Sequence, residues 1–491
     1  MNEPRHVRPF VREAGWELPT SLDTLVPRDH PVRFVAQYVD GLSGEDWLEL
    51  GIRWQEGGQG AHGYHPKVLL AVWLWGFMSG VRSSRRLEAA CAEQLSCLWL
   101  TGGQRPDHNT LWRFYQAHRA GMRYLLTDTV RMAVRLGLVD LAIQAVDGSK
   151  VSGNAAKERS YDQAGLDRLL DRTERAIAEL EAQNRTDETP PPPRLPEELA
   201  DAQALRARLQ EAREGLEPGT RINLTDGDAR LMPSRRGYVA GYNAQAVVSP
   251  LAEQRAGYRG MLVTAAEVTD APDDHAQLLP MLAAAEATTG VRATTTVADG
   301  GYHSAAVLAA CQARQQEVLM PEAQRTKLPG PYHKDRFRFD AATDTYPCPQ
   351  GQTLVFAGIR HRKDRLPMRA YRAGAAVCRA CPAFGTCTKD AHKGRLIEIS
   401  QENPVLVAHR ALMATARAKG LYARRKELVE PVFGIVKEQQ GLRRFLLRGK
   451  AGVRAEWCLV GASFNLRTLA RIWQRRPQLF AQCGQEGAAW A

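Results

Sequence analysis

The 491-residue sequence has no apolar run long enough to cross a membrane. Its longest apolar stretch, residues 68–81, has 14 residues and includes two glycines, whereas a membrane-spanning helix needs about 20 apolar residues. The first ten residues, MNEPRHVRPF, lack the apolar segment of a secretory signal. We therefore expect a cytoplasmic protein without membrane contact, in which residues 68–81 form a buried helix.

Acidic residues are fewer than basic ones. The chain has 54 Asp and Glu against 66 Lys and Arg, a net charge of +12 and a pI near 9.4. Residues 405–491 carry almost the whole excess, with 16 Lys and Arg against five Asp and Glu, or +11. A basic balance favours a polyanionic partner, and its concentration in one segment indicates where that partner binds.

The composition is otherwise ordinary. Apolar residues make up 44% of the chain and charged residues 24%, which excludes disorder, collagen and a coiled-coil rod as descriptions of the whole chain. No repeat of fixed period is present. The length alone indicates about three domains.

Residues 1–135 predict an N-terminal helical domain. Short helices are expected from residue 66, from residue 83 and after the glycine-containing turn at residues 101–110, where Leu111, Phe114 and His118 recur at helical spacing. Small helices joined by such a turn suit a DNA-binding helix-turn-helix module, and equally an ordinary helical bundle.

An α/β pattern follows. The expected elements are, in order, strands at 138–146, 241–248 and 260–268, a helix at 273–287, a strand at 291–298, a helix at 304–315 and a strand at 317–320. Three strands followed by alternating helices and strands indicate a mixed sheet. Asp273 or Asp274 would cap the first of these helices, in which Pro280 is the one awkward residue.

Two segments interrupt this domain, which we expect to span residues 136–475 before a C-terminal tail at 476–491. Residues 163–218 predict an antiparallel helical hairpin, because two amphipathic helices flank the proline run at 190–193. Residues 330–400 carry four cysteines.

Two aspartates follow strands of the expected sheet. Asp147 and Asp299 are each placed just past a strand and followed by glycine. If the two strands are parallel neighbours, both carboxylates emerge at one edge, where they repel unless a cation lies between them. Hard divalent cations such as Mg²⁺ take carboxylate ligands, and phosphoryl transfer often uses two such ions. An isolated Asp-Gly after a strand is more often a simple turn.

A third carboxylate would be needed to hold a second ion. Glu430 lies in LYARRKELVEPVFGIVKEQQ among basic residues, with Lys426 at −4 and Lys437 at +7. Because Pro431 disfavours the α region at the residue before it, we expect the helix to begin or kink there, with Glu430 at its mouth.

Several segments of the chain resemble one protein family. They are AVDGSKVSGNAA, TDGDARLMPSRRGYVAGYNAQAVV, VADGGYHS, LVEPVFGIVK and FNLRTLARI. Together they resemble the DDE-type transposases of bacterial insertion sequences, in the IS-four-like superfamily with a YREK signature. The resemblance extends over most of the chain, apart from the helical hairpin. It implies an RNase H-like catalytic domain, whose order of strands and helices matches the expected one.

The resemblance also implies site residues. Asp147, Asp299 and Glu430 match the three catalytic acids, which would bind Mg²⁺ or Mn²⁺. The signature places Tyr, Arg and Lys at −7, −4 and +7 from the Glu. Lys437 matches, whereas the Tyr and Arg positions hold Ala423 and Lys426, with Tyr422 and Arg425 next to them. These side chains would hold the phosphates at the transposon end. The expected contacts are Tyr422, Arg425, Lys426 and Lys437, with Arg443, Arg444 and Arg448 on the nearby DNA backbone.

Cysteine is scarce, and its spacing is informative. In a chain without a leader, nine cysteines favour thiols or metal ligands over disulfides. Cys378 and Cys381 have the spacing of zinc ligands, and Cys348 and Cys387 would complete a four-thiolate site. Reduced buried thiols or a redox pair remain alternatives. The other five cysteines, at positions 91, 97, 311, 458 and 483, are expected to be core residues.

The resemblance implies a function and partners. The protein would bind the terminal inverted repeats of an insertion sequence as a dimer on double-stranded DNA, cleave them with Mg²⁺ and join the freed 3′-OH to target DNA, in association with the bacterial nucleoid. Two alternatives are an RNase H-like nuclease without strand transfer and a catalytically decayed DNA-binding protein.

Overall fold

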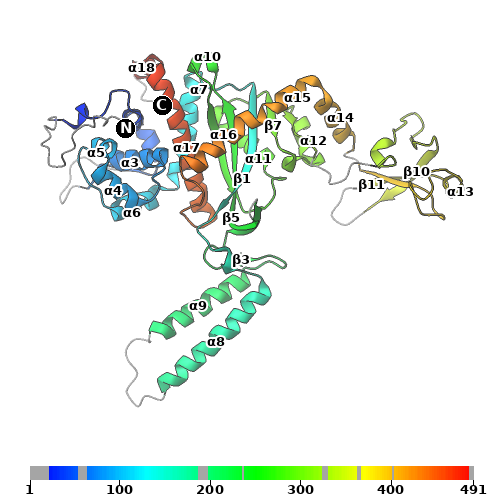
Figure 1. The fold of residues 1–491 in the computed structure, drawn as a ribbon, viewed down its shortest axis with the longest axis horizontal. Coiled ribbons are helices and arrows are strands. Elements are labelled where there is room, and N and C mark those ends of the chain that lie inside the picture. The colour runs from blue at the N-terminus through cyan, green and yellow to red at the C-terminus, as the bar shows by residue number, and fades with distance from the viewer. Residues whose placement is uncertain are drawn as a thin grey trace, which may run out of the picture. The chain divides into compact units, whose positions relative to one another are not determined.

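The computed structural model describes residues 21–53, 63–185, 197–234, 237–322, 330–361, 367–400 and 403–485 (Figure 1). The chain forms two compact units. One comprises residues 1–138, 252–260 and 435–491, and the other residues 139–251 and 261–434. Residues 435–475, which we expected in the catalytic domain, thus group with the N-terminal helices. No helix in the described part of the chain is both long and apolar enough to span a membrane.

The first unit is helical. Its described helices are α1 (Pro31–Asp40), α2 (Gly44–Glu49), α3 (Pro66–Ser79), α4 (Ser84–Glu93), α5 (Leu95–Leu100), α6 (His108–His118), α7 (Tyr124–Arg135), α10 (Glu253–Ala256), α17 (Lys450–Arg475) and α18 (Gln478–Gln485). The expected buried helix is α3, which starts with Pro66 in its first turn, where a missing N–H costs nothing. A short helix, α5, stands between α4 and α6, so the predicted glycine turn joins α5 to α6.

Helix α17 forms the centre of this unit. It packs against α1, α3 and α7, and 18 of its 26 residues are buried. A helix that is buried on nearly all sides is a core helix. The C-terminal segment is therefore structural as well as basic.

The second unit contains a six-stranded mixed sheet. Its strands are β1 (Ile143–Ser152), β4 (Arg230–Ser234), β5 (Gly237–Pro250), β6 (Met261–Thr269), β7 (Thr295–Ala298) and β8 (Glu317–Leu319). The order is β4-β5-β1-β7-β8, with β6 also paired to β5. Strand β1 is antiparallel to β5 and parallel to β7, and β7 is parallel to β8. This confirms the mixed α/β fold with an RNase H-like core; the sequence reading missed only β4.

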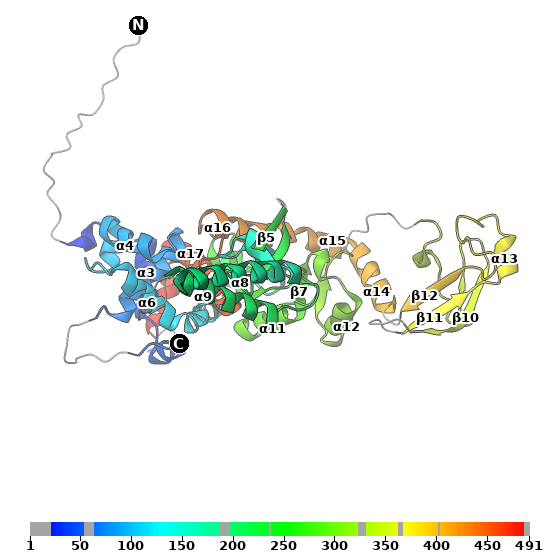
Figure 2. The same ribbon diagram turned by 90° about the horizontal axis from the view of Figure 1, so that it is seen from below.

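Helices lie on both sides of this sheet (Figure 2). Helices α11 (Leu278–Thr289) and α12 (Ala305–Ala313) cover one face, where they share a core with Val146 and Val247. The C-terminal helices of the unit are α14 (Asn403–Ala414), α15 (Ala416–Ala423) and α16 (Arg425–Glu438). Helix α16 runs across the other face.

Two helices that contain a proline have boundaries other than the expected ones. Helix α11 begins at Leu278 instead of Asp273, so Pro280 lies in its first turn, where no backbone donor is needed. Helix α16 continues through Pro431. The ring removes the hydrogen bond to the carbonyl of Glu427, but Glu427 and Pro431 are both exposed and water is available there. Glu430 therefore lies within the helix and not at its mouth, which corrects our expectation.

The helical insertion forms as predicted. Helices α8 (Gln163–Arg185) and α9 (Glu197–Glu214) pack against each other (Figure 1), and short strands β2 (Ser160–Tyr161) and β3 (Ile222–Asn223) pair at their base. Leu166 and Leu170 near the start of α8 contact Leu209 and Ala212 near the end of α9, which confirms the antiparallel arrangement. The proline run lies outside the described residues.

The cysteine-containing insertion is a small antiparallel sheet with one short helix. Its elements are β9 (Thr345–Pro347), β10 (Thr353–Arg360), β11 (Met368–Arg372), α13 (Ala375–Arg379) and β12 (Leu396–Ser400). The strand order is β12-β11-β10-β9. Its buried cluster contains only eight residues, one of them Cys378.

Candidate active site

Asp147 lies inside β1 rather than after it. The strand continues to Ser152, because residues 145–152 pair along their whole length with residues 241–248 of β5. The parallel partner β7 pairs only with residues 143–146 and then ends at Ala298. Asp147 is thus the first residue of β1 beyond the end of β7. The sequence predicted the same sheet edge for it, but on the assumption that β1 ends before Asp147.

Asp299 directly follows β7. Its carboxylate accepts a hydrogen bond from the backbone N–H of Gly301 at 2.7 Å and so caps the short 3-10 turn at residues 300–302. Since Ala298 is the register partner of Val146, Asp147 and Asp299 take equivalent places on neighbouring parallel strands. The predicted meeting of the two carboxylates at one sheet edge is therefore seen in the structure.

Arg425 connects the two aspartates. From the first residue of α16, its guanidinium lies 2.9 Å from Asp147 and 3.9 Å from Asp299. The Arg425 side chain is 14% exposed, and its Nε has no hydrogen-bond partner among the described residues. Two neighbouring carboxylates need a nearby positive charge, and Arg425 supplies it here. The sequence predicted this arginine as a DNA contact and did not foresee its contact with the acids.

Burial and neighbouring charges set the electrostatics of this edge. Burial raises the pKa of Asp147 to about 6; Arg425 lowers this pKa, while Asp299 and, less strongly, Asp274 raise it. Burial also raises the pKa of Tyr422; the charge of Arg425 lowers this pKa, and those of Asp299 and Asp147 raise it. Of the two residues one place away from the signature positions, Arg425 contacts Asp147 and lies 3.9 Å from Asp299, and Tyr422 is close enough to both acids for their charges to raise its pKa.

Glu430 is exposed on α16, and so is Lys426. Two turns along the same helix, Lys437 is half-buried. Arg443, Arg444 and Arg448 are exposed in the helical unit, where Arg443 forms an ion pair with Glu438 at 2.6 Å. The structure gives these side chains accessible positions, and their contacts with metal or DNA stay predictions.

The sequence reading missed the residues behind the two aspartates. Asp274, expected as a helix cap, instead accepts hydrogen bonds from Asn243 and Gln245 of β5. Tyr302 donates to Gln245. The signal that could have revealed this cluster is a glycine near each acid, Gly148 and Gly301, because a glycine in or beside a strand often marks a close approach.

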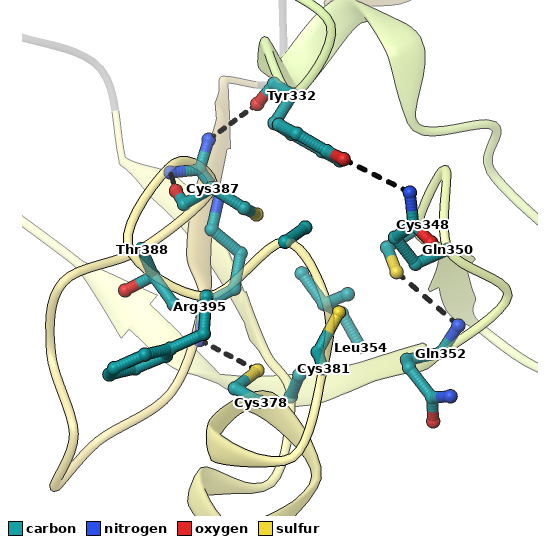
Figure 3. Close-up of a pocket in the computed structure, with 13 residues that line it drawn as sticks. Tyr332, Cys348, Gln350, Gln352, Leu354, Cys378, Cys381, Cys387, Thr388 and Arg395 are labelled. Atoms are coloured by element: carbon teal, nitrogen blue, oxygen red, sulfur yellow. Dashed lines mark hydrogen bonds between the residues drawn. The ribbon is translucent and has the colours of Figure 1, made fainter.

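The four cysteines of the insertion line one pocket (Figure 3). Their thiols are not in disulfides. The backbone N–H of Gln352 donates to Sγ of Cys348, and that of Arg395 donates to Sγ of Cys378, each at 3.3 Å. Of the remaining cysteines, those at positions 91, 97, 311 and 458 are buried, as predicted, whereas the side chain at 483 lies outside the described residues.

A metal ion needs several donor side chains directed at one point. Within the described ranges, no group of three or more His, Cys, Asp or Glu side chains is placed to hold a metal ion. At the sheet edge, Asp147 and Asp299 offer the facing carboxylates that Mg²⁺ prefers, and Arg425 shows that this pair attracts a cation. The chemistry of these two donors fits a divalent ion, and a third donor has to come from elsewhere.

Comparisons with known families found two matches in this chain. A family model described as "Transposase domain (DUF772)" matches residues 20–117, and one described as "Transposase DDE domain" matches residues 347–470. No curated protein matches the chain. The second match includes the four cysteines of the insertion and α16, and the first covers most of the N-terminal helices. The strands that carry Asp147 and Asp299 lie outside both matches. Together with an RNase H-like sheet that brings two aspartates together at its edge, the two matches support a DDE transposase of an insertion sequence.

Proposed function

We propose that this transposase binds the terminal inverted repeats of its element, cleaves the phosphodiester at each end and joins the freed 3′-OH to target DNA. The observation that carries the proposal is the pairing of Asp147 and Asp299 beside the basic N-terminus of α16. We further propose that it acts as a dimer on double-stranded DNA, in the nucleoid of a bacterial cytoplasm.

Three carboxylates would hold the metal ions. Asp147 and Asp299 already face one cation, and Glu430 on α16 is the proposed third ligand. Mg²⁺ or Mn²⁺ bound there would activate the attacking oxygen and stabilise the leaving oxygen. Tyr422, Arg425, Lys426 and Lys437 would hold the phosphates of the transposon end. Arg443, Arg444 and Arg448 would contact the DNA backbone nearby.

Replacing Asp147 tests the cleavage step. Asp147→Asn removes one charged ligand without changing shape, so we expect the Mg²⁺-dependent cleavage rate to fall by about 10³-fold or more. Binding of an end-containing duplex should persist, because the backbone contacts are made by other residues. Cleavage in single-turnover reactions and binding by mobility shift are the measurements. Undiminished cleavage by the variant would refute the assignment.

The alternative of a decayed DNA-binding protein makes a different prediction. Such a protein would bind DNA with a steep salt dependence and show no Mg²⁺-dependent cleavage of any end sequence. The DNA beside this reading frame supplies the substrate for this comparison, because an insertion sequence carries inverted repeats close to both ends.

We also propose that Cys348, Cys378, Cys381 and Cys387 bind a structural Zn²⁺. They line one pocket, two of their sulfurs accept backbone hydrogen bonds, and their small sheet has a core of eight residues. Domains with so little core commonly need a metal or disulfides. In the described structure the four thiols do not form a metal-holding group, so binding would draw them together.

Zinc content tests this proposal. Protein purified without chelator should contain one zinc per chain, and Cys381→Ser should lose it. Cys311→Ser, which changes a buried cysteine of α12, should retain it as the matched control. Zinc-free wild-type protein with four titratable thiols in the insertion would contradict the proposal, and so would an oxidised pair.

A further inference from the structure

Asp274 lies behind the two backbone segments that carry Asp147 and Asp299. It lies between β6 and α11 with its side chain 16% exposed. Its Oδ1 accepts hydrogen bonds from Asn243 Nδ2 and Gln245 Nε2, both at 2.6 Å, and Nζ of Lys150 lies 3.6 Å away. Asn243 and Gln245 have no exposed surface. A half-buried carboxylate with two short hydrogen bonds and a nearby ammonium is held in one place.

Asp274 abuts the glycine that follows Asp147. A Cβ added to Gly148 would lie 2.8 Å from Oδ1 of Asp274 and 2.3 Å from Nε2 of Gln245. Because side chains alternate along a strand, the missing side chain of Gly148 belongs to the face of β1 opposite Asp147. Asp274 thus supports the backbone of β1 from behind, at the residue next to the acid.

The same carboxylate abuts the segment that carries Asp299. A Cβ added to Gly301 would lie 3.3 Å from Oδ2 of Asp274, close enough that one of the two must move. Tyr302, which is fully buried, donates its hydroxyl hydrogen to Oε1 of Gln245. Gln245 therefore connects Asp274 to the turn capped by Asp299 through both ends of its amide.

We propose that Asp274 is a positioning residue that fixes the backbones of β1 and of the turn after β7, and so sets the separation of Asp147 and Asp299. This inference rests on the proposed function of those two acids. Asp274 is not itself a metal ligand in this proposal, because its Oδ1 is taken by two amide donors and a lysine. Outer residues that orient metal ligands typically affect metal affinity or activity 10–100-fold when changed.

Asp274→Asn and Asp274→Ala test the proposal in the full chain with an end-containing duplex. The asparagine keeps one oxygen to accept from Asn243 and Gln245 but loses the charge near Lys150, and alanine loses both. We expect cleavage at saturating Mg²⁺ to fall about 10-fold for Asn and about 100-fold for Ala. The Mg²⁺ concentration for half-maximal rate should rise, while the affinity for the duplex stays unchanged.

Asp273→Asn is the matched control, since Asp273 is exposed and its carboxylate caps only the N–H of His275. Binding of Mn²⁺ to the protein–DNA complex, followed by electron paramagnetic resonance, gives a readout that does not depend on turnover. Weaker Mn²⁺ binding in the Asp274 variants alone supports positioning. Wild-type metal binding and cleavage in Asp274→Ala would overturn the positioning role. A parallel fall in melting temperature, DNA affinity and cleavage would also overturn it, because it would indicate a general loss of structure. Inactive Asp147→Asn beside fully active Asp274→Ala would refute this inference while leaving the proposed function intact.

Discussion

Glu456→Ala is expected to lower the free energy of unfolding of the helical unit by about 3–5 kcal/mol. Glu456 lies in α17 with its side chain 2% exposed, and its carboxylate pairs with Arg82 at 2.5 Å. The same carboxylate accepts the backbone N–H groups of Leu446 and Leu447 at 2.9 and 3.0 Å. Alanine would leave a buried guanidinium, the buried N–H of Leu447 and the half-buried N–H of Leu446 without this acceptor, which is the costly way to break a buried pair.

The partner residue shows why the loss would be large. Arg82, whose side chain is 7% exposed, also donates to the carbonyls of Gly441 and Arg444 at 2.7 and 3.0 Å. The pair therefore fastens α17 to the segment before it and to the start of α4. Burial raises the pKa of Glu456, and Arg82 together with the two N–H donors opposes that rise.

Chemical denaturation of the full chain measures this effect. The matched control is Glu438→Ala, which breaks the ion pair with Arg443, where both side chains are more than 60% exposed. Exposed pairs contribute about 0–1 kcal/mol, so the control should unfold close to the wild type. Equal stability of Glu456→Ala and Glu438→Ala would show that the buried pair does not hold the helical unit together.

Glu430→Gln is expected to reduce Mg²⁺-dependent cleavage by about 10³-fold, because loss of the proposed third metal ligand would remove several kcal/mol of transition-state stabilisation. Glu427→Gln provides a control of the same chemistry. Both glutamates are exposed on α16, one turn apart, so the two variants remove the same charge from the same helix. The control should stay within a few-fold of the wild type, and both variants should bind the end duplex.

Single-turnover cleavage separates these outcomes. If Glu427→Gln lost activity while Glu430→Gln kept it, the third ligand would be Glu427. The match of Glu430 to the glutamate of the family signature would then be wrong by one turn of helix. This comparison is informative because the structure leaves Glu430 accessible and brings only Asp147 and Asp299 together.

Local patterns predicted much of the fold. Runs of β-branched and apolar residues gave β5, β6, β7 and β8, and the Asp-Gly pairs identified the acids that meet at the sheet edge. The end of β1 was predicted wrongly, because Asp147, Gly148 and Ser149 have the composition of a turn. Pairing with β5 outweighs that local preference and extends β1 to Ser152.

The parts that could not be predicted depend on contacts between distant residues. Aspartate is a residue type that commonly caps helices, so the sequence around Asp274 predicts a cap. Only the fold brings Asp274 to Asn243 and Gln245. Arg425 was recognisable as basic, but its contact with Asp147 requires α16 to cross the sheet. The grouping of residues 435–491 with the N-terminal helices rests on the burial of α17, which spacing within the helix does not reveal.

Strand joining tests the central claim most directly. A duplex that carries one pre-cleaved transposon end with a free 3′-OH is incubated with the protein, Mg²⁺ and a target plasmid, and joined product is measured. We expect joining by the wild type, none by Asp147→Asn and none without a divalent ion. Cleavage of intact ends with no joining of pre-cleaved ones would contradict it and identify an RNase H-like nuclease without strand transfer.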